Sequence, residues 1–288
     1  MSDPSGTIEH VSDTARWVAL YRAMESERPD ALFRDPYARR LAGARGAQIL
    51  AALPRGHTWA WPMIVRTAVM DELILRAIER DGVETVLNLA AGLDTRPYRL
   101  PLSPSLRWVE VDFPDVIAYK QAQLAGERPA CALEQVGIDL TDVARRRALF
   151  DRIGRAARRV LVVSEGLLIY LTPAAVASLA ADLAVPASFR WWLIDLASPR
   201  LLKMMERTWG RAVAQGNAPF QFAPAEGTGV FEPHGWREAE FRSMWEESLR
   251  LQRTMPLAWL WNLVGKLYPK SKRDEFRRMS GIVLLERS

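Results

Sequence analysis

Short apolar runs alternate with segments of helical spacing along the middle of the chain. Five runs have the length and the β-branched content of buried strands. Helices are expected between them, starting near Pro114, Thr141-Asp142 and Thr172-Pro173, where a proline or a capping side chain favours a first turn. This alternation predicts an α/β fold with a doubly wound, mostly parallel sheet. The predicted strands are residues 85–89, 107–112, 133–138, 159–164 and 189–196.

Helical spacing dominates the residues before the first strand. Apolar side chains recur at intervals of three and four residues after Ser12, Asp35-Pro36 marks a second helix start, and a long helix covers about residues 62–80. Residues 1–80 are therefore expected to form an N-terminal helical extension. The α/β core that follows is expected to span residues 81–198.

The pattern is less regular after Ser198. Residues 199–288 are expected to form a lid-like insertion on the substrate side, together with the last strands of the same domain. The predicted elements are helices over 199–213 and 236–248, an ordered loop or lid over 215–235, strands over 249–254 and 281–286, and a basic helix over 270–278.

Composition narrows the class of protein. The chain of 288 residues has a formal charge of +5 spread over many segments, which is typical of a solvated basic surface. A single cysteine, Cys131, fits a reducing compartment, and no run reaches the ~18 apolar residues of a membrane helix. We expect a cytoplasmic protein, monomeric or homodimeric, with neither nucleic acid nor membrane as partner. The three separated histidines give no reason to expect a metal site.

Polar or small residues follow four of the predicted strands. The Gly92 loop, Asp112, Asp139 and Glu165 all fall at the carboxyl edge of a parallel sheet, where ligands bind in such folds. Asp112 lies twenty residues after Gly92, the spacing at which an acid reaches the ribose of an adenosine ligand. A single glycine is too few for a phosphate cradle. S-adenosylmethionine therefore fits better than a dinucleotide, with Arg66 or Arg96 as the cation for its carboxylate.

Several stretches are similar to a known family. The chain resembles the leucine carboxyl methyltransferases, which include protein phosphatase methyltransferases and tetracenomycin-type polyketide O-methyltransferases. The resemblance implies the Rossmann-like fold of class I methyltransferases. It is carried by residues 88–100 (Asn-Leu-Ala-Ala-Gly-Leu-Asp-Thr-Arg-Pro-Tyr-Arg-Leu), 32–38 (Leu-Phe-Arg-Asp-Pro-Tyr-Ala), 66–67 (Arg-Thr), 110–114 (Glu-Val-Asp-Phe-Pro) and 164–171 (Ser-Glu-Gly-Leu-Leu-Ile-Tyr-Leu).

The resemblance implies a role for each matching position. Arg66 would hold the carboxylate of S-adenosylmethionine, Asp112 its ribose diol, and Glu165 its amino group. The remaining implied cofactor contacts are Ala90 and Gly92 at the methionine portion, and Asp139 and Leu140 at the adenine.

The chain departs from the family pattern at two places. It has Ala90-Ala91-Gly92 where the family has Gly-Ala-Gly, and a methyl group at position 90 is tolerable if the φ angle there is negative. The family's lysine in the first helix has no clear match, although Arg16 or Arg22 stands nearby in the sequence.

The function expected from these features is O-methylation of a carboxylate or phenolic hydroxyl on a small molecule, such as a polyketide or other secondary metabolite. A carboxylate acceptor needs no base because it is ionised at neutral pH, whereas a phenol would use Tyr170 or His234 as candidate bases. Three alternatives stay open: methylation of a protein C-terminus, a catalytically silent cofactor-binding protein, and a nicotinamide-dependent oxidoreductase.

Overall fold

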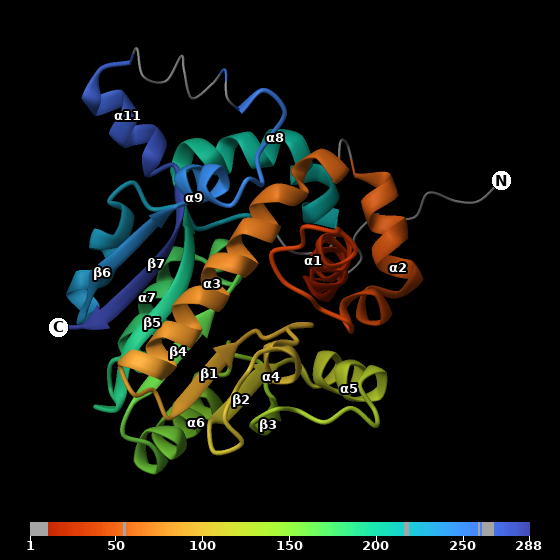
Figure 1. Ribbon diagram of the computed structural model, residues 1–288. Coiled ribbons are helices and arrows are strands. Elements are labelled where there is room, and N and C mark those ends of the chain that lie inside the picture. Colours follow the sequence, from red (N-terminus) through yellow and green to blue (C-terminus); the bar gives the residue numbers. More distant parts are fainter. Residues whose placement is uncertain (1–10, 54–55, 216–218, 259, 261–267) are drawn as a thin grey trace.

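One mixed sheet of seven strands organises the computed structural model, which describes residues 11–53, 56–215, 219–258, 260 and 268–288 (Figure 1). The strand order is β3-β2-β1-β4-β5-β7-β6. The first five strands run parallel, and β7 lies antiparallel to both β5 and β6. The predicted doubly wound sheet is thus confirmed. The strands are β1 (Thr85–Leu89), β2 (Arg107–Asp112), β3 (Ala132–Gly137), β4 (Val160–Ser164), β5 (Phe189–Ala197), β6 (Trp236–Ser243) and β7 (Ser280–Arg287).

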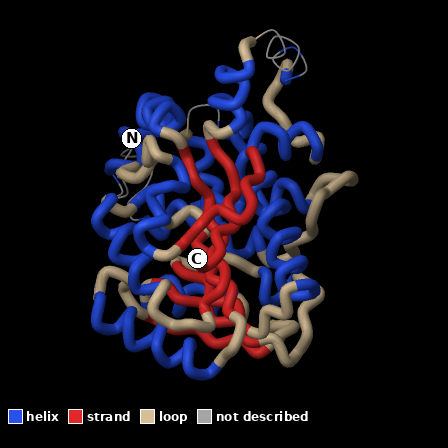
Figure 2. Tube along the Cα trace, turned by 90° about the vertical axis from the view of Figure 1, so that its left-hand side faces the viewer, coloured by secondary structure: helices blue, strands red, loops and turns tan. Residues whose placement is uncertain are grey.

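Alternate side chains of each strand enter different cores on the two faces of the sheet. In β1, Leu87 and Leu89 pack with α6 (Val143–Ala156) and α7 (Pro173–Leu183), whereas Val86 packs with α3 (Ala60–Arg80). Successive side chains of a strand point to opposite faces of the sheet, and both faces are buried here. Neighbouring residues in the strands are therefore mostly apolar rather than alternately apolar and polar. Figure 2 shows the strands in the middle with helices on either side. Two short helices, α4 (Arg96–Arg99) and α5 (Pro114–Gln123), follow β1 and β2.

A third core joins the N-terminal helices to one another. It contains side chains of α1 (Val11–Ser26), α2 (Ala38–Ala52) and the first turns of α3, and it extends to Leu93 in the loop after β1. The short helix η1 (Gly56–Trp59) links α2 to α3. Arg253, just after α9 (Met244–Arg250), forms a buried ion pair with Glu25 at 2.8 Å. The helical extension is thereby fixed to the C-terminal part of the chain.

The C-terminal part contains two elements that the sequence pattern misassigned. Residues 236–243 form the edge strand β6 rather than a helix, and residues 249–254 complete α9 (Met244–Arg250) and a turn rather than a strand. The spacing of charged residues in β6 is typical of a solvent-exposed helix. In the structure these side chains form ion pairs beside the sheet, such as Arg76–Glu240 and Arg237–Glu286. Charged residues are common on edge strands. Pairing with β7 therefore decides the conformation.

Three other C-terminal elements agree with the expectations in kind, namely α8 (Pro199–Gln215), α11 (Lys270–Arg277) and the final strand β7. Within the expected loop or lid over residues 215–235, a short helix, η3 (Gly227–His234), forms instead. The segment 259–267 is rich in aromatic and apolar residues in the sequence, and of it the structure describes only Leu260. Within the part of the chain that the structure describes, no helix combines the length and apolar character needed to cross a membrane.

Candidate active site

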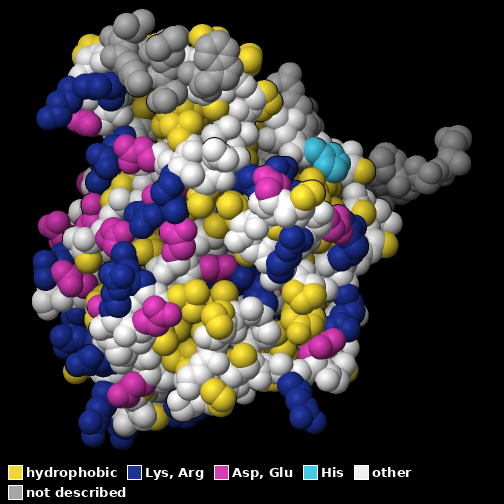
Figure 3. Space-filling model, viewed as in Figure 1, with side chains coloured by type: hydrophobic (Ala, Val, Ile, Leu, Met, Phe, Trp, Pro, Cys, Tyr) yellow, Lys and Arg dark blue, Asp and Glu magenta, His cyan; other side chains and the backbone are white. Residues whose placement is uncertain are grey.

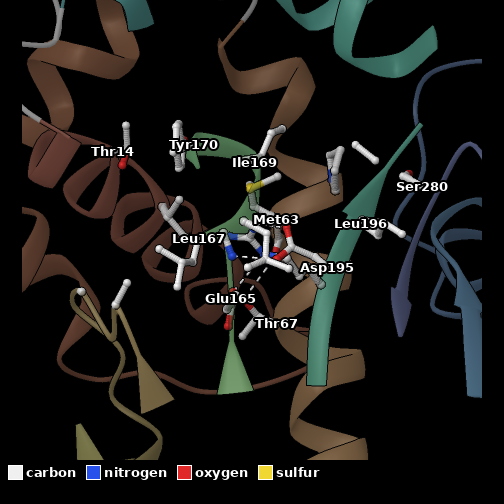
Figure 4. Close-up of a pocket in the computed structure, with 18 of the residues that line it drawn as sticks. Thr14, Met63, Thr67, Glu165, Leu167, Ile169, Tyr170, Asp195, Leu196 and Ser280 are labelled. Carbon is white, nitrogen blue, oxygen red and sulfur yellow. Dashed lines mark hydrogen bonds and ion pairs between the residues drawn. The ribbon is translucent and has the colours of Figure 1, made fainter. Parts of the chain in front are cut away.

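A cavity of about 650 Å³ lies at the carboxyl ends of β1, β2, β4 and β5. Its volume falls in the range of small-molecule sites. The strand ends supply its polar groups, Asp112, Glu165 and Asp195 among them, while α3, α8 and the segment after β4 supply mainly apolar side chains. Figure 4 shows Glu165 and Asp195 side by side at the ends of β4 and β5, with Met63 and Ile169 nearby. The cavity therefore has a charged part and an apolar part.

The loop after β1 turns through left-handed backbone conformations. Ala90 has φ +51° and Gly92 has φ +49°. The condition under which a methyl group at position 90 is tolerable, a negative φ, is therefore not met. An L-residue with a Cβ is strained in this region, whereas glycine is not. The chain turns sharply at the strand end so that Ala90, Ala91 and Gly92 all line the cavity.

The carboxylate of Asp112 holds this loop against the end of β2. One oxygen accepts a hydrogen bond from the Gly92 amide at 2.6 Å, and the other accepts one from the Phe113 amide at 2.7 Å. Burial raises the pKa of Asp112, and these two hydrogen bonds oppose the shift. A carboxylate oxygen has two acceptor sites. Asp112 can therefore position the loop and still accept hydrogen bonds from a ligand.

Arg96 lies at the centre of a buried charge network. Its guanidinium pairs with three carboxylates through Nε and Nη1, with distances of 2.6 Å to Asp71, 2.9 Å to Asp94 and 2.8 Å to Glu165. The residue is only 2% exposed. Asp71 also binds Arg99 through both of its oxygens. Arg96 consequently organises other side chains, and the structure does not present it as the free cation considered for a cofactor carboxylate.

Arg66 connects Glu165 to Asp195. Its Nε donates to Glu165 and its Nη1 to Asp195, both at 3.0 Å. Burial alone would raise the pKa of Glu165, but Arg96 and Arg66 together hold it below its usual range. Gly166 has φ +65°, and a Cβ there would lie 3.3 Å from the Arg66 guanidinium. A glycine at this position thus permits both the turn and the close approach of the arginine.

Asp195 is a site residue that sequence reasoning missed. Its carboxylate receives Arg66 on one oxygen and the Gly166 amide on the other, at 2.7 Å. It is the one acidic residue of β5, and it interrupts the apolar run that follows Arg190. An acidic residue near the carboxyl end of an apolar strand is the same sequence signal by which Asp112 and Glu165 were predicted as site residues.

Tyr170 lies in the apolar part of the cavity. Its ring packs against Phe220 with 5.7 Å between centroids, and Figure 4 shows Thr14 of α1 opposite it. Burial raises the pKa of the Tyr170 hydroxyl, while Arg66 and a hydrogen bond with Thr14 oppose the shift. The hydroxyl is therefore protonated at neutral pH and able to donate a hydrogen bond.

The structure does not bring every predicted residue to the cavity. His234 ends η3 beside Trp236, which pairs with Arg287 at the amino-terminal edge of the parallel strands. That edge is opposite to the cavity, because β7 returns antiparallel between β5 and β6. His234 is thus too remote to serve as a base there.

The expected adenine contacts lie at the margin. Asp139 is exposed, and one of its oxygens accepts hydrogen bonds from the amide and the hydroxyl of Thr141, both at 2.8 Å. Thr141 itself lines the cavity, whereas Leu140 packs against the core on the α6 side of the sheet. Asp139 therefore shapes the turn that presents Thr141.

Of the two arginines considered in the first helix, Arg22 reaches the loop. Arg22 donates to the Leu93 carbonyl at 2.5 Å and to Asp35 at 2.9 Å. Arg16 instead stacks on the ring of Tyr119, 3.9 Å from its centroid. The first helix thus contributes a cation that supports the loop after β1.

Comparison with known proteins identifies the relatives of the chain. The sequence profile described as "Leucine carboxyl methyltransferase" matches residues 15–184. The chain belongs to the leucine carboxyl methyltransferase family. The family match covers the N-terminal helices, the loop after β1 and the strands through β4, which supply most of the polar cavity residues.

Two relatives show how far the sequence similarity extends. A protein of Mycolicibacterium smegmatis, named "Putative S-adenosyl-L-methionine-dependent methyltransferase", is 40% identical over 178 residues, which are 56% of this chain and 58% of the relative. A protein of Frankia alni with the same description is 32% identical over 262 residues, covering 84% of this chain and 89% of the relative. The chain thus spans about three fifths of the mycobacterial relative and most of the Frankia one.

A solved structure shows the same architecture. The crystal structure of a DUF574 family protein from Streptomyces avermitilis superposes with a TM-score of 0.61 and 13% identity, covering 96% of this chain and 97% of that one. A crystal structure described as that of a "putative methyltransferase" from Thermobifida fusca superposes with a TM-score of 0.53 and 14% identity, covering 99% of this chain and 97% of that one. With the strand order described above, these similarities confirm the expected class I methyltransferase fold.

Proposed function

We propose that the protein transfers a methyl group from S-adenosylmethionine to a carboxylate oxygen of a small acceptor. One observation carries the proposal: a single cavity contains both the charged side chains at the strand ends and a region lined by apolar side chains, which we call the chamber. Membership of the leucine carboxyl methyltransferase family supports the same chemistry.

The donor set at the strand edge fits S-adenosylmethionine. Asp112 has acceptor sites left for a ribose diol, and Gly92 allows a ligand to approach the backbone closely. Glu165 and Arg66 offer opposite charges to the amino and carboxylate groups of the methionine portion. When bound, the cofactor supplies a methyl group on a positively charged sulfur, which is a good leaving group.

The chain's own residues then position the acceptor and exclude water. Orientation in such a site can contribute on the order of 7–11 kcal/mol. Because its pKa is raised, Tyr170 acts as a hydrogen-bond donor rather than as a base. Of the described histidines, His57 is exposed in η1 and His234 lies at the opposite edge of the sheet. The described cavity lining therefore favours an acceptor that is already ionised, which a carboxylic acid is and a phenol is not.

The experiment compares acceptors of matched shape. Calorimetry first measures the binding of S-adenosylmethionine, S-adenosylhomocysteine and NADH, and we expect only the first two to bind. The protein is then incubated with methyl-labelled S-adenosylmethionine and either benzoate or phenol. A methyl ester releases labelled methanol in mild alkali, whereas a methyl ether does not. Alkali-stable product from phenol, or NADH binding without S-adenosylmethionine binding, would contradict the proposal.

A further inference from the structure

Methionine side chains from separate segments contribute to the apolar lining of the cavity. Six of the nine methionines of the chain line it, and they come from α3, α8, α9 and the turns near α9 and β7. Methionine is unbranched and polarizable, and it adapts to ligands of different shape. The lining methionines are Met63, Met204, Met205, Met244, Met255 and Met279. Such a chamber suits a flexible apolar chain better than a rigid ring system.

The cavity reaches the surface between α8 and α11. Met204 on α8 and Phe276 on α11 both line it, yet they are 40% and 37% exposed. Arg200 connects the two helices, because it pairs with Glu275 at 3.1 Å and lies over the Phe276 ring. The described part of the mouth is thus built from two C-terminal helices rather than from the nucleotide-binding core.

The two helices at this mouth carry more positive than negative charge. Residues 199–208 and 270–278 contain eight Lys and Arg against three Asp and Glu. Two of these cations, Arg277 and Arg278, pair with Glu246 and Glu238, which lie outside the two segments. When these two glutamates are counted with the three acids of the segments, eight positive charges remain against five negative ones. Lys203 and Arg207 of α8 are exposed. Figure 3 shows Lys and Arg side chains beside hydrophobic ones at the upper left, where α11 lies. A rim of this kind attracts an anion.

We propose that the acceptor is a monocarboxylic acid with a flexible aliphatic chain. This inference rests on the proposed function and specifies its substrate. The basic rim draws the carboxylate inward, the carboxylate passes to the Tyr170 end of the chamber, and the chain stays among the methionines. A carboxylate oxygen attacks the methyl carbon, the carbon–sulfur bond breaks, and its electron pair stays on sulfur. The products are a neutral methyl ester and S-adenosylhomocysteine, and no proton is transferred.

The first test measures kcat/KM for straight-chain acids of four to twelve carbons at saturating S-adenosylmethionine. We expect an increase of about fourfold for each added methylene, which corresponds to ~0.8 kcal/mol, until the chamber is filled. A flat series would overturn the inference, and so would a tenfold preference for benzoate or for a peptide C-terminus. Both outcomes would leave carboxylate methylation intact. Methylation of none of these acids, despite cofactor binding, would instead refute the proposed function.

Two variants test the chamber and the rim separately. Met205→Trp should move the best substrate to a shorter chain, because it reduces the volume of the chamber. Lys203→Glu should lower kcat/KM for decanoate about threefold at low salt, and the difference should disappear at high salt. The matched control is Arg155→Glu, which makes the same change of charge at an exposed position of α6 away from the cavity. An equal loss in both charge variants, or no change in chain preference with Met205→Trp, would refute the inference.

Discussion

Replacing Ala90 by glycine should stabilise the protein, although most substitutions in a buried loop destabilise. The φ of Ala90 is +51°, and a left-handed conformation costs an L-residue roughly 1–2 kcal/mol. Glycine does not have this cost, but it gains chain entropy in the unfolded state, which is worth about 0.4–1 kcal/mol. Ala90 is half-buried, so little apolar contact is lost. The net expectation for Ala90→Gly is a stabilisation of about 0.7 kcal/mol.

The next residue supplies the control. Ala91 is not among the residues with positive φ, and it is 6% exposed. Ala91→Gly should therefore lose about 0.8 kcal/mol of methyl burial and roughly 0.5–1 kcal/mol through backbone entropy. The two variants should differ by about 2 kcal/mol in the free energy of unfolding.

The assay is urea denaturation of the ligand-free protein, with thermal unfolding as a second measure. For a domain of this size a change of 1 kcal/mol shifts Tm by roughly 2–4 °C. Ala90→Gly should therefore melt a few degrees above Ala91→Gly and slightly above the parent. If Ala90→Gly destabilises as much as Ala91→Gly, the strain assigned to Ala90 is not present in the folded protein.

Three further predictions concern the carboxylates. Asp195→Asn should raise the KM for S-adenosylmethionine about tenfold with a smaller effect on kcat, because Arg66 loses a charged partner; an effect on kcat alone in steady-state kinetics would contradict this role. Asp112→Ala should weaken S-adenosylmethionine binding at least tenfold in calorimetry, whereas an unchanged dissociation constant would exclude the ribose assignment. Burial alone would raise the pKa of Asp94, but Arg96 and Lys120 hold it below the ordinary value of 3.8. The ionised Asp94 therefore contributes fully to the free energy of unfolding above about pH 4, and this contribution is lost as the pH falls towards the pKa of the folded state. Asp94→Asn should consequently flatten the acid side of the profile of stability against pH. A parallel profile for the variant would show that Asp94 does not contribute.

The features that the sequence predicted depend on local pattern. Residues 85–89 form a strand from a short, mainly apolar run, and Asp112 and Glu165 were found from their places at strand ends. His234 and β6 were misjudged because both depend on β7 inserting antiparallel between β5 and β6. No local signal in residues 234–243 reports that insertion.

The conformation of Ala90 is a different kind of failure. The family's glycine at position 90 drew attention to the φ angle there, but the alanine of this chain left the sign of that angle undecided. The positive φ becomes understandable only when the contacts around the loop are known. Asp112 holds the Gly92 amide, Asn88 donates to Asp94, and Arg22 binds the Leu93 carbonyl. These partners come from β2, β1 and α1, and strained backbone persists where the surroundings over-determine it.

This explanation makes a prediction that separates imposed strain from locally preferred geometry. If Arg22 helps to force the loop into place, Arg22→Gln should let the backbone at Ala90 relax. The gain from Ala90→Gly should then be smaller by about 0.5 kcal/mol in the Arg22→Gln background, which is the lower limit for residues coupled through a shared structure. A double-mutant cycle in urea measures this coupling, with Arg155→Gln as a distant background in which the gain should remain complete. Additivity in both backgrounds would show that the turn at Ala90 is set by residues 88–94 themselves. A coupling seen only with Arg22→Gln would show that the first helix holds the strained loop at the edge of the cavity.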